Sequence, residues 1–199
     1  MKPYWIVLAA LPLSGCPAYG IYDRTAEQPV LTSTCYAVKL PSFLFEARCA
    51  DLKASGFGGR EFCPGIQAFN PPPRIYSSGF IAPFAFPKSW ADYVSDREKW
   101  DQRPLEKPLF EKQRTLIAPI DPGTQMKISG LYDYPKGETG HVSIVRALIT
   151  SGPHAGTSVE LRSPGDFKRL GPAWTTVPDI GKSNVEVVNT YLEPCETRP

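Results

Sequence analysis

The stretch GHVSIVRALITSGPHAGTSVELRS, residues 140–163, carries the clearest secondary-structure pattern in this chain of 199 residues. Its first half alternates two sets of side chains: Val142, Ile144, Arg146 and Leu148 on one face, and Ser143, Val145, Ala147 and Ile149 on the other. A period of two is typical of a β-strand. Val159 and Leu161 flank Glu160 after the glycine-containing turn. The stretch therefore predicts two strands around a tight turn.

Similar strand patterns lie on both sides of this hairpin. Residues 116–135, LIAPIDPGTQMKISGLYDYP, contain a Pro-Gly turn at 122–123 and then the alternating Met126, Ile128 and Gly130. Residues 34–46, TCYAVKLPSFLFE, are rich in strand-forming residues, although Pro41 requires an edge strand or a bend. Residues 184–195, NVEVVNTYLEPC, alternate again. Several short strands joined by glycine turns predict a mainly β fold, either a small barrel or a sandwich.

Composition narrows the partners and the architecture. The chain has 22 prolines, about twice the usual share of ~5%. Proline works against long helices and central strands, so we expect short strands and many turns. The formal net charge is only +2. That balance argues against nucleic acid as a partner, because its binding requires clustered positive charge.

The first residues have the composition of a targeting segment. Lys2 is followed by an uncharged run from Tyr4 to Leu13. This run is too short to span a bilayer, which needs about 20 apolar residues. It has the length of the apolar region of a signal peptide, which small residues follow at the cleavage site. We expect residues 1–15 to be a signal peptide.

The sequence Leu13-Ser14-Gly15-Cys16 resembles the lipobox of bacterial lipoproteins. The resemblance implies cleavage before Cys16 and lipidation of that cysteine, which would anchor the protein to a membrane. Two or three acyl chains hold firmly, whereas one holds only marginally. Pro17 in place of an aspartate favours the outer membrane, with the protein facing the periplasm. We expect residues 16–31 to form the lipidated N-terminus and a tether, since they show no regular period.

The remaining chain, residues 32–199, is similar to the bacterial SH3-like domains of cell-envelope proteins. CYAVKLPSFLFE resembles their opening strand, LIAPIDPGTQMKISGL their second strand region, and VVNTYLEP their final strand. The resemblance implies one small SH3-like barrel. The chain departs from the family in a long, proline-rich insertion at about 47–112, and it lacks the usual Gly-Trp before the last strand.

Four further cysteines, Cys35, Cys49, Cys63 and Cys195, form an even set, as expected for disulfides in an exported chain. Four cysteines allow three pairings. We favour Cys49–Cys63, which closes a short local loop. Because the first and last strands of SH3-like barrels lie close together, the resemblance implies Cys35–Cys195 as the second pair.

One helix is predicted, at 90–101, where Ser89 can cap the N-terminus and Asp92 follows three residues later. Its aromatic residues have two interpretations: they pack the helix onto the body, or they form a recognition surface. For the second, the candidate binding patch is Phe80, Phe84, Phe86, Trp90, Tyr93 and Trp100.

Signatures of catalysis are weak, so we expect no catalytic residues, no metal site and no cofactor. His141 and His154 have no partner at motif spacing, and there is no GxSxG or HExxH motif. Asp92 and Asp96 could act as a carboxylate pair on a glycan, although a solvated helix face is the simpler interpretation.

The function we expect is a lipid-anchored, non-enzymatic binding or scaffold module of the cell envelope. Its partner would be a protein, a peptide or peptidoglycan. Two alternatives stay open. One is a periplasmic inhibitor or immunity lipoprotein that neutralises a toxic effector, and the other is a glycan hydrolase with an unrecognised carboxylate site.

Overall fold

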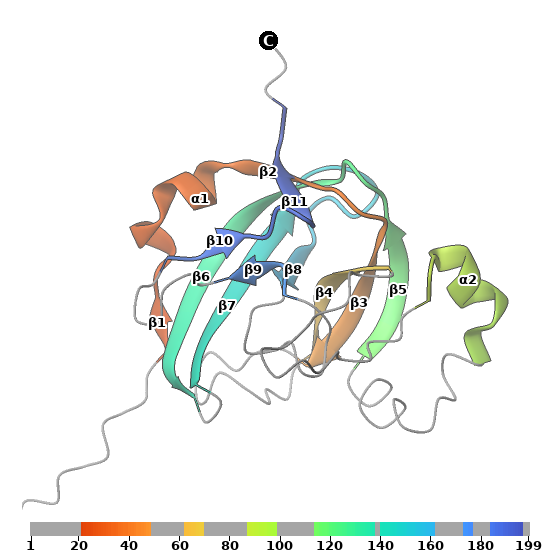
Figure 1. Cartoon of the computed structure of the whole chain (residues 1–199), viewed down its shortest axis with the longest axis horizontal. Coiled ribbons are helices and arrows are strands. Elements are labelled where there is room, and N and C mark those ends of the chain that lie inside the picture. Colours follow the sequence, from red (N-terminus) through yellow and green to blue (C-terminus); the bar gives the residue numbers. More distant parts are fainter. Residues whose placement is uncertain are drawn as a thin grey trace, which may run out of the picture.

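The structure, a computed structural model of the whole chain, describes residues 21–48, 62–69, 87–98, 114–137, 140–161, 173–176 and 184–196. The described residues are mainly β, as predicted (Figure 1). In chain order the elements are β1 (Tyr22–Asp23), a 3-10 turn η1 (Thr25–Glu27), α1 (Pro29–Ser33), β2 (Cys35–Val38), β3 (Ser42–Arg48), β4 (Phe62–Ala68), α2 (Trp90–Ser95), β5 (Arg114–Ile120), β6 (Gln125–Gly137), β7 (Gly140–Ile149), β8 (Ser158–Leu161), β9 (Thr175–Thr176), β10 (Glu186–Val187) and β11 (Leu192–Pro194).

One nine-stranded sheet forms the body of the protein. Its strand order is β11-β2-β6-β7-β8-β4-β3-β5, and β1 pairs separately with β6. All pairings are antiparallel except the one between β4 and β8, where Gly65 lies opposite Glu160. The sheet is open, with β11 and β5 at its two ends. The mainly β fold is therefore confirmed, whereas the SH3-like barrel is not.

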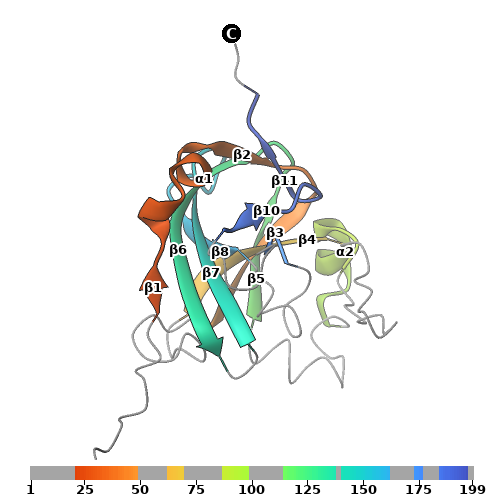
Figure 2. The same ribbon diagram turned by 60° about the vertical axis from the view of Figure 1, so that its left-hand side comes forward.

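The sheet curves around the larger of two hydrophobic clusters, which forms the main core. Figure 2 shows β6 and β7 on one side of the core and β3 and β5 on the other. The core takes residues from both sides, among them Ile128 and Val145 from the first and Leu44 and Ile120 from the second. The two-stranded sheet β9-β10 and Trp174 complete this core. Residues far apart in the sequence are thus buried together.

The predicted hairpin of residues 140–163 is confirmed as β7 and β8, paired from Val145↔Leu161 to Leu148↔Ser158. Val145, Ala147 and Ile149 face the core, and Leu148 on the opposite face is exposed. The turn at Pro122–Gly123 is also present, and Gly123 adopts φ 84°. Only glycine takes that conformation without strain, which explains its position in the turn.

The predicted opening strand, residues 34–46, is divided into two. β2 ends at Val38, Pro41 precedes β3, and β3 continues to Arg48. The region expected as an insertion, 47–112, also contributes to the core. β4 pairs with β3 and β8, and its Ile66 and Ala68 are fully buried. In its described part, this region extends the sheet.

The prediction that residues 16–31 form a tether is wrong for residues 21–31. Tyr22 and Asp23 pair with Tyr132 and Asp133 of β6. Between β1 and β2, the Arg24 N–H donates to the Leu131 carbonyl at 2.8 Å, and the Leu131 N–H donates to the Thr25 hydroxyl at 3.0 Å. Leu31 of α1 is buried in the core. This segment satisfies the edge of β6, and its lack of a period reflects three very short elements.

Replacing Leu31 by alanine is expected to lower the free energy of unfolding by about 2–3 kcal/mol, because a buried leucine is removed. Val30, the preceding residue, is 78% exposed. Val30→Ala should change the stability by less than about 0.5 kcal/mol. Urea unfolding followed by circular dichroism measures both. Equal midpoints for the two variants would contradict the packing of α1 on the sheet.

Candidate functional site

The predicted disulfide between Cys35 and Cys195 is present. It joins the start of β2 to the residue after β11, with Cα atoms 5.3 Å apart across a sequence separation of 160. The Cys195 N–H also donates to the Cys35 carbonyl at 2.8 Å. Cys63 is disulfide-bonded too. Cys49 lies outside the described residues, so the pairing Cys49–Cys63 stays a prediction. Cys16 also lies outside them.

Only two members of the predicted aromatic patch, Trp90 and Tyr93, fall in the described part of the chain. Phe80, Phe84, Phe86 and Trp100 lie outside it. Tyr93 is only 3% exposed, and Trp90 packs partly buried beside it, with ring centroids 5.3 Å apart. They join a second buried cluster formed by Phe43, Phe45, Phe69 and Leu116. Both residues therefore attach α2 to the sheet, which was the simpler of the two interpretations.

The predicted cap of α2 is confirmed. The Ser89 hydroxyl accepts a hydrogen bond from the Asp92 N–H at 3.0 Å. The Asp92 carboxylate accepts one from the Lys88 N–H at 2.8 Å. α2 ends at Ser95, where Asp96 is the C-cap with φ −142°; Arg97 and Glu98 are again helical, and residues 99–101 of the predicted helix lie outside the described residues. The Asp92 carboxylate therefore stabilises the start of α2. Asp92 is one of the two residues of the possible carboxylate pair, Asp92 and Asp96.

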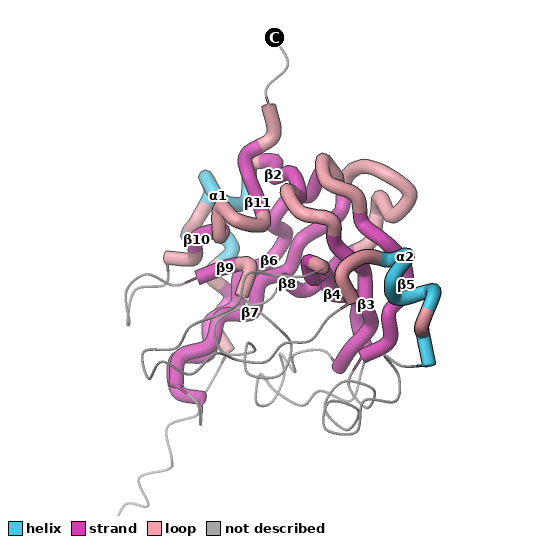
Figure 3. Tube along the Cα trace, turned by 45° about the vertical axis from the view of Figure 1, so that its right-hand side comes forward, coloured by secondary structure: helices cyan, strands magenta, loops and turns pink. Residues whose placement is uncertain are grey.

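The outward side of α2 and the neighbouring strand β5 form a surface with exposed apolar groups, which we call the α2–β5 flank. It comprises Val94, 58% exposed, Ile117, 46% exposed, and the exposed Arg97. Arg97 is positioned by Tyr93: its Nε donates to the phenol oxygen at 3.0 Å, and its guanidinium carbon lies 5.3 Å from the ring centroid. Figure 3 shows α2 projecting beside β5 at the end of the sheet. Val94 and Ile117 are single exposed apolar side chains on neighbouring elements, and they make this flank the candidate contact surface.

Strand β5 lies at an end of the sheet, yet its sequence limits strand addition. Pro119 cannot donate a backbone hydrogen bond, and the pairing with β3 shifts register at Leu44/Phe45, next to Ile117. Proline and bulges are common ways of protecting an edge strand from pairing with other chains. Recognition at this flank would therefore rest on side chains rather than on main-chain pairing.

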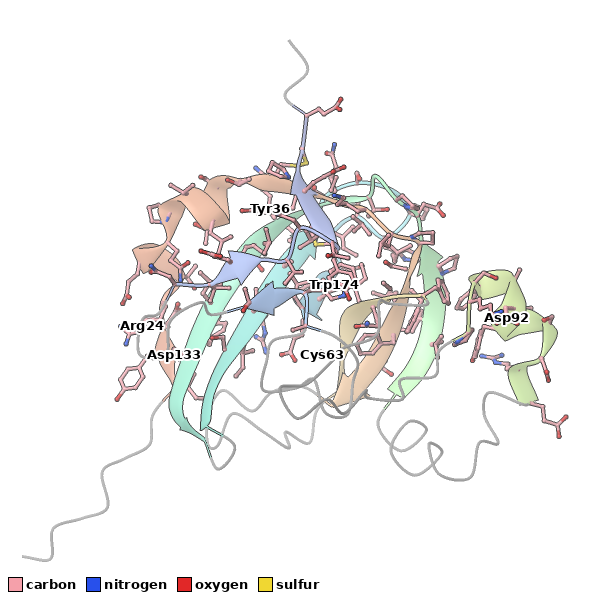
Figure 4. All side chains as sticks on the ribbon, in the orientation of Figure 1. Arg24, Tyr36, Cys63, Asp92, Asp133 and Trp174 are labelled. Carbon is pink, nitrogen blue, oxygen red and sulfur yellow. A yellow bond between two sulfur atoms is a disulfide. The ribbon has the colours of Figure 1, made fainter. Side chains whose placement is uncertain are left out.

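A second cluster of polar groups surrounds β1, in the segment that the sequence assigned to the tether. Arg24 pairs with Glu27 at 2.7 Å and lies 4.0 Å from the buried Asp133 (Figure 4). The hydrogen bond that Arg24 donates to the Glu27 carboxylate raises the pKa of Arg24. Hydrogen bonds from Thr25 lower the pKa of Asp23. Arg24 also lies 5.2 Å from the ring centroid of Tyr22. Figure 4 shows this cluster on the opposite side of the molecule from Asp92.

The histidines and the possible metal ligands do not form a site within the described residues. His154 lies in the turn between β7 and β8, and the side chain of His141 is outside the description. Within the described ranges, no group of three or more His, Cys, Asp and Glu residues could hold a metal ion. None of the helices described is long and apolar enough to cross a membrane.

No family model matches the sequence, and no curated protein or solved structure matches it either.

Proposed function

We propose that this chain is a lipid-anchored cell-envelope protein, facing the periplasm and most consistent with the outer membrane, that acts as a non-enzymatic binding or scaffold module. Its partner is a protein, a peptide or peptidoglycan. The disulfide supports export, and the α2–β5 flank supports the binding role. The binding role rests on one observation, the exposed apolar groups of the α2–β5 flank beside a helix fixed by buried aromatics.

Export is supported by the Cys35–Cys195 disulfide. Disulfides persist in oxidising compartments such as the periplasm and are rare in the cytosol. This bridge joins strands that already pair, from Leu192↔Val38 to Pro194↔Tyr36. A chain with this bridge and the lipobox-like Leu13–Cys16 segment is suited to the cell envelope, where Cys16 would carry the lipid.

The SH3-like part of the proposal rests on strands β2, β6, β7, β8 and β11. The strands that resemble the first and last of the family, β2 and β11, are neighbours, as such barrels require. From β2 the sheet extends through β6, β7 and β8, and each neighbouring pair of strands is antiparallel. We propose that these five strands are the SH3-like unit and that β3, β4 and β5 are an addition beyond β8.

The binding role is tested by changing Val94 on the α2–β5 flank. Val94→Asp is expected to reduce binding of the partner at least tenfold, since a charge would replace an exposed apolar contact. The matched control is Val30→Asp: Val30 is also an exposed valine on a short helix, α1, which lies on the other side of the sheet in Figure 1. The measurement is retention of detergent-solubilised lipoprotein on purified sacculi and on immobilised periplasmic proteins.

The material retained distinguishes the candidate functions. Binding to sacculi that Val94→Asp loses and Val30→Asp keeps supports a wall-binding module. One stoichiometric periplasmic protein with no sacculus binding would favour the inhibitor or immunity role. Release of soluble fragments from sacculi would replace the proposal by a glycan hydrolase. Identical retention of both variants would show that the α2–β5 flank is not the binding surface.

A further inference from the structure

The place where the folded body begins limits how far the protein can stand from its membrane. This inference rests on the proposed lipid anchor at Cys16. Five peptide units separate Cys16 from Ile21, the first described residue, which directly precedes β1. A chain spans at most about 3.6 Å per residue, so Ile21 lies at most about 18 Å from the anchored cysteine. A segment of sixteen residues, as the sequence suggested, would have allowed about three times that reach.

The body itself is longer than this connection. Tyr22 pairs with Asp133, eight residues beyond the start of β6 at Gln125. At about 3.3 Å per residue, the turn at Pro122–Gly123 lies about 26 Å from β1 along that strand. Figures 1 and 2 both show β1 and β11 at different ends of the molecule. In an inverted orientation, the Pro122–Gly123 turn would lie on the bilayer with β6 upright. That orientation would need a longer connection than the segment between Cys16 and Ile21 provides.

The surface at β1 has the side chains for contact with lipid headgroups. Tyr22 is 47% exposed, although most large aromatic side chains described here are buried. Arg24 lies against its ring. Tyrosine is enriched at membrane interfaces because its ring and hydroxyl suit the boundary between apolar and aqueous regions. Asp23, Arg24 and Glu27 sum to a formal charge of −1. A contact between this surface and lipid headgroups would therefore not depend on attraction to anionic lipid.

From these observations we infer that the surface formed by Tyr22, Asp23 and Arg24 lies on the headgroups of the membrane that holds the lipid of Cys16. The protein then stands with β1 at the bilayer and with β11 and the Pro122–Gly123 turn directed away from it. Partners in the aqueous space meet the far end and the sides of the sheet.

The test compares two dye positions on the full-length lipoprotein in vesicles of phosphatidylethanolamine and phosphatidylglycerol that contain a rhodamine-labelled lipid. Ala26→Cys lies near β1 and Asp121→Cys lies at the far turn, and both positions are exposed. Energy transfer to the labelled lipid is expected to be strong from position 26 and weak from position 121. Tyr22→Ser should reduce the transfer from position 26 without changing the unfolding midpoint. Equal transfer from both positions, or no effect of Tyr22→Ser, would overturn the inference.

Intact mass measured on the same samples separates this inference from the proposal on which it rests. If Cys16 carries lipid and the two dyes give equal transfer, the orientation is wrong and the anchor stands. If no lipid is found on Cys16, the anchor is wrong and the orientation falls with it. Lipid on Cys16 together with the expected difference between the dyes supports both.

Discussion

Replacing both Cys35 and Cys195 by serine is expected to lower the free energy of unfolding by about 5 kcal/mol. The bridge closes a loop with a sequence separation of 160. In the chain-entropy model, the stabilisation by a disulfide grows with the logarithm of the loop length and reaches this value for such a loop. Small domains have a total stability of about 5–15 kcal/mol. The loss is therefore expected to remove about a third or more of the total stability.

Urea unfolding distinguishes the origin of this loss. Because the effect acts on the unfolded chain, which expands when the bridge is absent, the slope m should rise while the midpoint falls. The strand pairing of β11 with β2 can remain in the folded variant, including the Cys195–Cys35 backbone hydrogen bond. A loss below about 1 kcal/mol, or non-reducing peptide maps that link Cys35 to another cysteine, would contradict the bridge.

Trp174→Ala is expected to lower the free energy of unfolding by about 3–5 kcal/mol, the usual cost of truncating a buried aromatic side chain. Trp174 is fully buried and stacks on Tyr191, with ring centroids 5.2 Å apart and planes inclined by 7°. Its backbone carbonyl accepts from the Val188 N–H at 2.8 Å. The side chain thus joins the sheet β9–β10 to the core, and its loss leaves a large cavity.

A second substitution at the same position separates packing from polarity. The indole N–H of Trp174 is buried without a hydrogen-bond partner among the described residues, and such a group costs about 1–3 kcal/mol. Trp174→Phe removes that N–H and keeps a ring, so it should cost less than half as much as Trp174→Ala. Tyr22→Ala, at an exposed aromatic, is the control and should change little. If phenylalanine were as damaging as alanine, the packing argument would be wrong.

The strands that sequence alone predicts best are those whose local pattern matches their surroundings. In β7 and β8, alternating residues meet a core on one face, and the glycine turn fixes the register. The cap of α2 is equally local, since Ser89 and Asp92 are three residues apart. The pairing of Cys35 with Cys195 followed from a resemblance that places the first and last strands together. In each case the sequence pattern, or the resemblance, already indicated the contact that the structure contains.

The parts that sequence did not predict depend on distant partners. Residues 21–33 form three very short elements without a common period, and Tyr22 to Thr25 pair or hydrogen-bond with β6, about 100 residues later. β4 contains Pro64, Gly65 and Gln67, which are unusual in a buried strand. A Cβ at Gly65 would lie 2.4 Å from the ring of Phe45, so the glycine allows that ring to pack on the strand. Gln67 is fully buried, although its amide has no hydrogen-bond partner within the part of the chain that the structure describes. Four of the six proposed patch residues lie outside the described ranges, so the aromatic patch stays a prediction.

The position of β11 in the sheet also determines when the fold can be completed. β2 needs β11 on one edge, and Cys35 needs Cys195, yet the two cysteines are separated by 160 residues. At about 5–20 residues per second, ribosomes take roughly 8–32 s to make the intervening chain. During this interval one edge of β2 has no neighbour, and an unpaired strand edge invites association with other chains. The edge of β2 that β11 covers therefore stays open until the last part of the chain is available, and the fold is completed only then.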